Sequence, residues 1–313
     1  MNELTAFVVS FPASLLISLL FDGIDRKLHA RMQKRIGPPI IQPIYDLIKL
    51  FSKERIIPIT ASARIFETMP IISASTSLLA ASIVLSNIIA EVSVVGDLIL
   101  VIYLLAVASI ALMIGGSASG NPYSAIGFSR KISMIIAYEI PMFISVISIA
   151  LGLSPTLTIN GIIRFQSNMR APSLLLRLSA AIAAAAFMIC VPAAASVVPF
   201  DIPEAKTEII YGFLVEYGGP YLALAKIAKA SSNFTLTLLA ATIFLYTPSF
   251  LGVNASQISL LLCLATSLAV MFITITLPRT IFARLKVGQA FRFYWMLPLT
   301  LSTISAILSV VGF

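Results

Sequence analysis

The segment Val198-Pro-Phe-Asp-Ile-Pro-Glu-Ala-Lys-Thr-Glu-Ile-Ile-Tyr-Gly-Phe-Leu-Val-Glu-Tyr-Gly-Gly-Pro220 separates two long apolar runs, residues 174–199 and 218–246. Each run exceeds the ~18 apolar residues that indicate a membrane-spanning helix. Four acids gather between the runs, in a chain that has only 13 acids among its 313 residues. Carboxylates clustered at a membrane boundary can hold and pass protons, so this acidic loop, residues 200–220, is the first candidate for function.

Apolar sequence dominates the rest of the chain. Hydrophobic residues make up 59% of it, charged residues make up 11%, and the mean hydropathy is +1.01. Soluble domains carry about 25% charged residues. Eight spans are predicted, at residues 4–21, 66–90, 97–116, 132–152, 174–199, 218–246, 257–278 and 293–312. We therefore expect an all-α integral membrane protein that forms one polytopic domain over residues 1–313, with about eight transmembrane helices.

Basic residues are distributed unevenly among the predicted loops. Nine lysines and arginines lie within residues 22–65, after the first span, and more follow the third, fifth and seventh spans. The opposite side carries Arg164, Arg170 and Arg177. The positive-inside rule then predicts a chain of the cell membrane with its N-terminus outside and its odd-numbered loops in the cytoplasm. The net charge of +8 reflects this topology and an attraction to anionic lipids. It does not indicate nucleic-acid binding.

Residues that commonly bind metals are sparse. Cys190 and Cys263 both lie in apolar spans, and His29 is the single histidine. An iron–sulfur cluster is normally held by four cysteines. We therefore expect no metal or redox cofactor bound by this chain, with any electron chemistry located in partner chains.

The segment of residues 22–65 contains an amphipathic pattern. An apolar stripe at helical spacing is formed by Ile41, Ile44, Tyr45, Ile48 and Phe51, widened by Leu47 and Leu50. The opposite face carries Gln42, Asp46, Lys49 and Lys53. This pattern predicts a cytoplasmic amphipathic helix at the membrane surface, with Pro43 in its first turn.

A basic strip, Arg31-Met-Gln-Lys-Arg-Ile-Gly-Pro-Pro39, precedes this helix. One interpretation is an anchor that contacts lipid phosphates. The other is a docking platform for a soluble subunit, in which Gly37 and Pro38 fix the direction of the chain.

Glu139 lies about seven residues into the fourth predicted span, beside Pro141. An ionised carboxylate at that depth costs a few kcal/mol or more unless water or a cation accompanies it, which suits Glu139 to reversible protonation. The alternative is a protonated glutamate that bonds a neighbouring helix. We interpret Glu139 as a proton-relay site.

The acidic loop supports more than one interpretation. Asp201-Ile-Pro-Glu204 has the pattern of an N-cap followed by a capping-box glutamate, which would explain both acids structurally. Glu208 follows Glu204 by four residues, so a helix would place both carboxylates on one face, where they could share a proton. Capping explains neither Glu208 nor Glu216. Candidate counter-ions for these acids are Lys226 and Arg130.

These motifs together resemble the H-type membrane subunit of the superfamily of complex I and membrane-bound nickel–iron hydrogenases. The resemblance covers nearly the whole chain. It is carried by Asp25-Arg-Lys27, by Arg35-Ile-Gly-Pro38 with Gln42-Pro-Ile-Tyr-Asp-Leu-Ile-Lys-Leu50, by Ser129-Arg-Lys with Tyr138-Glu139, and by Pro199-Phe-Asp-Ile-Pro-Glu204 through Glu216-Tyr217.

The resemblance implies a subunit that links a redox arm to an ion pump. Implied partners are hydrogenase-like large and small subunits, an iron–sulfur subunit, antiporter-like membrane subunits and ferredoxin as electron donor, with iron–sulfur clusters and a nickel–iron or derived site in those partners. Implied docking residues are Asp25, Arg26, Lys27, Arg31, Arg35, Gly37, Pro38, Gln42, Asp46 and Lys49. Implied proton-path residues are Glu139, Asp201, Glu204, Glu208 and Glu216.

Two departures from the family pattern narrow this expectation. The segment before Gln42 is shorter than in quinone-linked members, and the family's Glu-Arg-Lys is Asp25-Arg-Lys27 here. The short segment favours a ferredoxin-fed hydrogenase or a sulfur-reducing relative over a quinone-reducing complex. Outside this family, the alternatives are an autonomous ion transporter and a passive membrane anchor.

Overall fold

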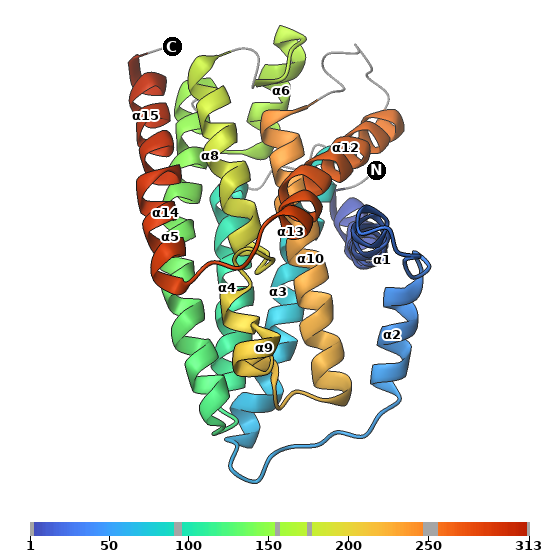
Figure 1. The fold of residues 1–313 in the computed structure, drawn as a ribbon. Helices are drawn as coiled ribbons and strands as arrows, with labels where there is room; N and C mark the ends of the chain where they lie inside the picture. Colours follow the sequence, from blue (N-terminus) through green and yellow to red (C-terminus); the bar gives the residue numbers. More distant parts are fainter. Residues whose placement is uncertain (1–2, 91–95, 154–156, 174–176, 247–255, 312–313) are drawn as a thin grey trace.

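The computed structural model describes residues 3–90, 96–153, 157–173, 177–246 and 256–311, and the regular elements in these ranges are all helical (Figure 1). Helical segments there that are long and apolar enough to cross a membrane number seven: Phe7–Met32, Ala63–Ile89, Asp97–Ser117, Pro122–Gly152, Gly219–Phe244, Ile258–Ile281 and Val287–Val311. The remaining predicted span contains the shorter apolar helix α8 (Leu178–Ala194). The all-α, multi-pass membrane fold is thus confirmed. Residues 174–176 and 312 of the predicted spans lie outside the described residues.

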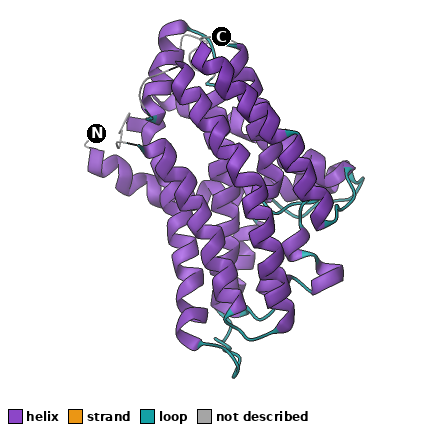
Figure 2. Cartoon of the chain, turned by 90° about the vertical axis from the view of Figure 1, so that its left-hand side faces the viewer, coloured by secondary structure: helices purple, strands orange, loops and turns teal. Residues whose placement is uncertain are grey.

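The bundle is built around α10 (Gly219–Phe244). Its neighbours include α3 (Ala63–Ala90) and α8, and α4 (Asp97–Ser117) packs on α3. The apolar window of α10 is 83% buried, so this helix is enclosed by protein more than by lipid. Figure 2, turned by 90°, shows the same helices joined mainly by short loops.

The helix α1 (Glu3–Met32) is longer than the predicted span 4–21 and lies across the others, so that Figure 1 shows it end-on. The predicted boundary is wrong because charged residues continue the helix. Arg26 reaches back to Asp22 across one turn, with Nη2 and Oδ2 2.6 Å apart, and such pairs support helical structure. The first part of the segment 22–65 is therefore helical, and Asp25 within it is only 6% exposed.

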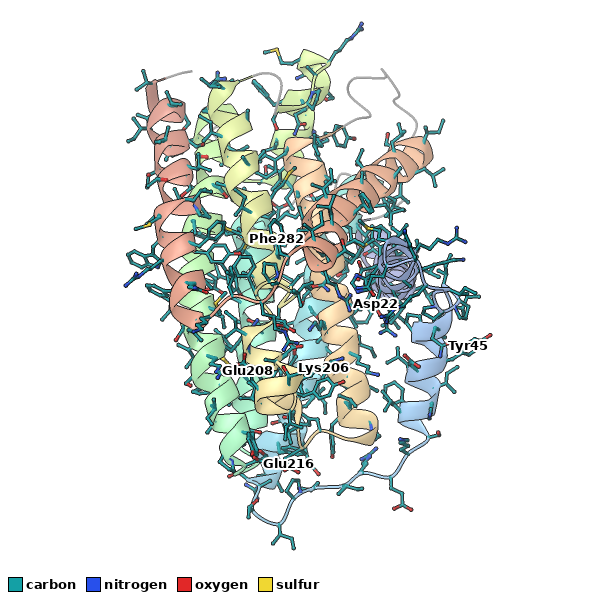
Figure 3. All side chains as sticks on the ribbon, viewed as in Figure 1. Asp22, Tyr45, Lys206, Glu208, Glu216 and Phe282 are labelled. Carbon is teal, nitrogen blue, oxygen red and sulfur yellow. The ribbon has the colours of Figure 1, made fainter. Side chains whose placement is uncertain are left out.

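The predicted amphipathic helix is found as α2 (Gln42–Phe51), and Pro43 lies in its first turn. It lies beside α1 and the lower half of α10 in Figure 1. Its apolar stripe is split between two directions. Leu47 and Leu50 are buried, whereas Tyr45 is 57% exposed and points away from the bundle (Figure 3). The position of this helix relative to the membrane surface stays a prediction.

The helix α5 (Pro122–Leu153) begins ten residues before the predicted span 132–152. Arg130 and Lys131, which we expected in a loop, are therefore helical, and Lys131 is 4% exposed. Hydropathy placed the boundary at these charges, but the protein interior accommodates Lys131 by giving it polar neighbours.

The C-terminal spans are interrupted. The helix α12 (Ser256–Met271) continues through a π-helical turn, Phe272–Thr276, into α13 (Leu277–Ile281). The last span consists of α14 (Val287–Met296) and α15 (Pro298–Val311), divided before Pro298. The short helix α6 (Ile159–Met169) lies between α5 and α8 in the chain. π-Helical turns are uncommon in proteins, and those that occur often lie at functional sites. The residues around the turn that ends at Thr276 are therefore candidates for a functional role.

Candidate functional site: a polar cavity inside the bundle

A cavity of about 70 Å³ lies where α3, α4, α5 and α10 meet the acidic loop. Its ionisable lining consists of Lys131, Tyr138, Glu139, Glu204 and Lys229, and much of the rest is apolar. One water molecule needs about 10–15 Å³ of such volume. The cavity therefore has room for a short chain of roughly five water molecules beside two carboxylates and two amines.

Three of the charged groups of the cavity, Lys131, Glu204 and Lys229, are paired or hydrogen-bonded. The Lys229 ammonium group donates to Oε2 of Glu204. Lys131 Nζ donates to Ser196 Oγ at 2.7 Å, and both Glu204 and Glu139 lie within electrostatic range of Lys131. Buried charges are stable only when they are paired and solvated by polar groups, and interacting sites titrate together. Lys131 therefore interacts electrostatically with one carboxylate of the loop and with one carboxylate of α5.

The acidic loop folds as three short helical turns: η1 (Ile202–Glu204), α9 (Lys206–Ile209) and η2 (Gly212–Leu214). The predicted capping box is wrong, because the Asp201 side chain makes no cap hydrogen bond and instead accepts from Arg284 Nη2 at 2.8 Å. The predicted shared face of Glu204 and Glu208 is also wrong. Ala205 lies between them in an extended conformation, with φ −60° and ψ 108°, and so interrupts the helix.

Glu208 and Asp201 face away from the cavity. Arg130 Nη1 donates to Glu208 Oε2 at 2.6 Å, and Glu208 is 56% exposed on the outer side of α9 (Figure 3). Both acids line a separate surface cavity with Arg130 and Arg284. Burial raises the pKa of Asp201 above its ordinary value, although the Arg284 guanidinium partly offsets this effect. Of the acids in this part of the loop, Glu204 is the one that reaches the inner cavity.

The end of the acidic loop is fixed to the base of the bundle. Asn121 Nδ2 donates to Glu216 Oε1 at 2.6 Å, at the lower end of the view in Figure 3. The ring of Tyr217 stacks on Phe66 with centroids 4.3 Å apart, and its hydroxyl donates to the Phe66 carbonyl at 3.2 Å. Burial raises the pKa of Tyr217, so this hydroxyl stays a neutral donor.

A second charged cluster joins α1 to the C-terminal spans. Asp25 Oδ1 accepts from Thr276 Oγ1 at 2.6 Å, and Asp25 Oδ2 accepts from Arg279 Nη1 at 3.1 Å. Thr276 ends the π-helical turn. The side chain of Asp25 is therefore engaged within the chain, and its predicted docking role is untested.

The same cluster extends to α2. Arg26 Nη1 donates to Asp46 Oδ2 at 3.0 Å, and Gln42 Nε2 donates to Asp46 Oδ1 at 3.3 Å. Burial works against ionisation of Asp46, but these hydrogen bonds outweigh it and hold the pKa of Asp46 below its ordinary value. The ion pair between Arg26 and Asp46 thus joins α2 to α1 and helps to orient the surface that the two helices present.

The remaining docking candidates lie on the surface near α2. Arg31, Arg35 and Lys49 are exposed, and Lys27 is partly exposed. Gly37 turns the chain back against α1, where an added Cβ would lie only 2.9 Å from Cβ of Ala30. Pro38 follows in the same turn. The turn therefore presents the basic strip in one orientation, as the docking interpretation requires.

Sequence reasoning missed three polar residues of the inner cavity. Lys131 lies just before the predicted span 132–152, and Lys229 and the uncharged Asn233 lie within the predicted span 218–246, where the hydropathy pattern gives neither a partner. Lys229 and Asn233 are four residues apart and therefore share one face of α10. This spacing is the sequence pattern that could have identified the two residues as neighbours. The partner of Glu204 is Lys229 and not Lys226, which instead acts electrostatically on Asp46.

Groups of three or more His, Cys, Asp or Glu side chains able to hold a metal ion do not occur among the described residues. Cys190 and Cys263 are both buried as free thiols.

Comparison with known proteins gives consistent matches. The family model described as NADH dehydrogenase matches residues 4–310. The H-type subunit of NADH-quinone oxidoreductase from Thermomicrobium roseum is 34% identical over 242 residues, covering 71% of each chain. Hydrogenase-4 component C of Escherichia coli is 32% identical over 84% of this chain and 80% of its own length. A solved structure of the membrane-bound sulfane sulfur reductase, an archaeal respiratory membrane complex, matches with a TM-score of 0.88 and 30% identity, over 99% of this chain and 100% of the other.

Proposed function

Because this chain belongs to the family of H-type NADH dehydrogenase membrane subunits, we propose that it links the electron-transferring arm to the ion-translocating arm of a ferredoxin-oxidising respiratory complex. Its relatives are membrane subunits of complex I, of hydrogenase-4 and of a sulfur reductase. In this proposal the partners are hydrogenase-like large and small subunits, an iron–sulfur subunit and antiporter-like membrane subunits.

The observation that carries the coupling role is the inner cavity. It combines Glu139 on a membrane-spanning helix with Glu204 on a loop, together with Lys131 and Lys229. Proton transfer requires carboxylates that can exchange protons through water, and a low-dielectric surrounding makes each charge sensitive to the others. An acid on a helix and an acid on a loop, in one cavity with room for water, meet both requirements.

The coupling step follows from the position of the acidic loop. Glu204 faces the cavity, while Asp201 and Glu208 on the outer side of the same loop are held by Arg284 and Arg130. A redox-linked displacement of the loop from the partner side moves Glu204 relative to Lys229. The proton affinity of Glu139 then changes, and a proton or sodium ion is moved in the membrane arm.

The docking surface is α2 with the basic strip of residues 31–39. The Arg26–Asp46 ion pair holds α2 against α1, and the strip exposes Arg31 and Arg35. The soluble arm binds here and at the outer face of the acidic loop, which places its electron carriers close to Glu204. The opposite parts of the bundle contact the lipid bilayer and the antiporter-like subunits.

Glu139→Gln in the intact complex tests the coupling role. In membrane vesicles we expect ion translocation to fall at least about tenfold while electron transfer is retained, because glutamine cannot carry the proton. Glu67→Gln is the matched control, since Glu67 is a carboxylate on α3 that does not line the cavity. Unchanged translocation in Glu139→Gln would remove Glu139 from the path.

Purification of the complex from native membranes tests the choice of electron donor and acceptor. Nickel together with ferredoxin-driven hydrogen evolution supports the hydrogenase branch, and iron without nickel supports a sulfur-reducing complex. The relatives that reduce quinone, at 34% identity, favour a quinone-reducing complex as the second candidate. Quinone-dependent activity that ferredoxin cannot drive would select it.

A further inference from the structure

A second, smaller cavity lies beside the inner cavity, between α1, α10 and the π-helical turn. Its volume is about 10 Å³. It is lined by Phe21, Asp22, Asp25, Ala230, Asn233, Phe234, Met271 and Ile275. This volume is at the lower limit for one water molecule, which also needs two to four polar partners. Asp22, Asp25 and Asn233 supply three.

Among the described residues, Asn233 is the one that lines both cavities. It lies on α10 one turn beyond Lys229, and its Oδ1 is buried without a hydrogen-bond partner in the described part of the chain. A buried acceptor left unsatisfied costs about 1–3 kcal/mol, and such groups are normally bonded to protein or ordered water. Water in either cavity would satisfy this oxygen.

Apolar side chains form part of the wall beside Asn233, and Asp22 and Asp25 also line the small cavity. Phe21 and Phe234 meet edge to face with ring centroids 4.8 Å apart, and Ile275 lines the same small cavity. Water that passes from one cavity to the other therefore has Asn233 as its polar contact at the junction. An amide there can both accept and donate hydrogen bonds.

We propose that Asn233 joins the two cavities into one hydrated proton path, from Asp22 and Asp25 to Glu204 and Glu139. The inference rests on the proposed coupling function and extends the path to the cluster that holds α2. In each transfer a carboxylic acid on one side releases its proton to water, and a neighbouring water releases one to the carboxylate on the other side. Asn233 positions the water and neither gains nor loses a proton.

The isosteric pair Asn233→Thr and Asn233→Val tests this path in the intact complex. Both side chains are smaller than asparagine and alike in shape, and only threonine keeps a hydrogen-bonding group. We expect Asn233→Thr to keep most of the ion translocation per electron transferred. Asn233→Val should lose it at least about tenfold with electron transfer intact, because water loses its polar contact at the junction.

Two controls separate the possible failures. Thr235→Val makes the matching loss of a hydroxyl group on α10 at a residue that lines neither cavity, and it should leave translocation unchanged. Equal translocation in the threonine and valine variants, whether retained or lost, would overturn the proposal, because the hydroxyl group would then be irrelevant. If the two Asn233 variants translocate ions equally while Glu139→Gln abolishes translocation in the same vesicles, only the proposal for Asn233 fails. If Glu139→Gln is also without effect, the proposed coupling function fails.

Discussion

The contact between α4 and the acidic loop can be disturbed by one methyl group. An ideal Cβ built on Gly116 would lie 2.1 Å from the carbonyl oxygen of Phe213 and 2.7 Å from its Cβ. Ordinary van der Waals contact for such a carbon begins at 3.4 Å. Gly116→Ala therefore forces the backbone of the loop and α4 apart by about 1 Å, since close-packed interiors leave little slack.

The expected size of the effect follows from this displacement. Overpacking of this kind costs about 1–3 kcal/mol of stability. Phe213 belongs to the same loop as Glu204, and misplacing a reacting group by ~1 Å can cost about 10²-fold in rate. We expect Gly116→Ala to lower ion translocation about 10- to 100-fold relative to electron transfer.

The assay compares ion translocation with electron transfer in the same vesicles and the thermal unfolding of the purified complex. Gly288→Ala is the matched control, because Gly288 is also helical and an added Cβ there meets no atom within 4 Å. Both variants gain the same helix propensity, so the comparison isolates the steric contact. If the Gly116→Ala complex unfolds and translocates ions like the Gly288→Ala complex, the close contact between Gly116 and Phe213 does not position the acidic loop.

Three further substitutions probe the ion pairs and the loop anchor. Asp25→Ala leaves Arg279 without its buried partner and should lower the thermal stability of the chain by about 1–3 kcal/mol, measured by unfolding in detergent. The pKa of folded Asp46 lies below its ordinary 3.8, so its advantage over Asp46→Asn should be complete above pH 3.8 and disappear as the pH falls through the folded value. Tyr217→Phe removes the hydrogen bond to the Phe66 carbonyl while keeping the stacked ring, and should cost about 0.5–1.5 kcal/mol.

A different result would contradict each of these three predictions. Asp25→Ala with unchanged stability would mean that Arg279 and Thr276 find other partners. A constant stability difference between the wild type and Asp46→Asn from pH 6 to pH 3 would show that the pairing of Asp46 does not favour its ionised form. Tyr217→Phe destabilised as much as Tyr217→Ala would place the energy outside the ring stacking.

The fold class and most of the spans follow from local properties of the sequence. A helix in lipid must satisfy its backbone internally and must be apolar over some 20 residues, and both requirements can be read from composition alone. The helix α2 could be predicted for a similar reason, because its apolar stripe is a local pattern. The family resemblance could be recognised from local motifs as well, among them Asp25-Arg-Lys27 and Pro199–Glu204. The position of Glu139 within an apolar run, where an ionised carboxylate is costly, could also be read from the sequence.

Which charged side chains contact one another depends on how the helices and loops pack, and this cannot be read from local sequence. Lys131 precedes one predicted span and Lys229 lies within another, yet both line the cavity with Glu204 and Glu139. The loop acids were separated because Lys229, Arg130 and Arg284 approach them from three different helices or loops, and no local pattern encodes that approach. Hydropathy reports the cost of burying a charge, whereas the partners that offset this cost are long-range contacts that exist only once the helices have packed.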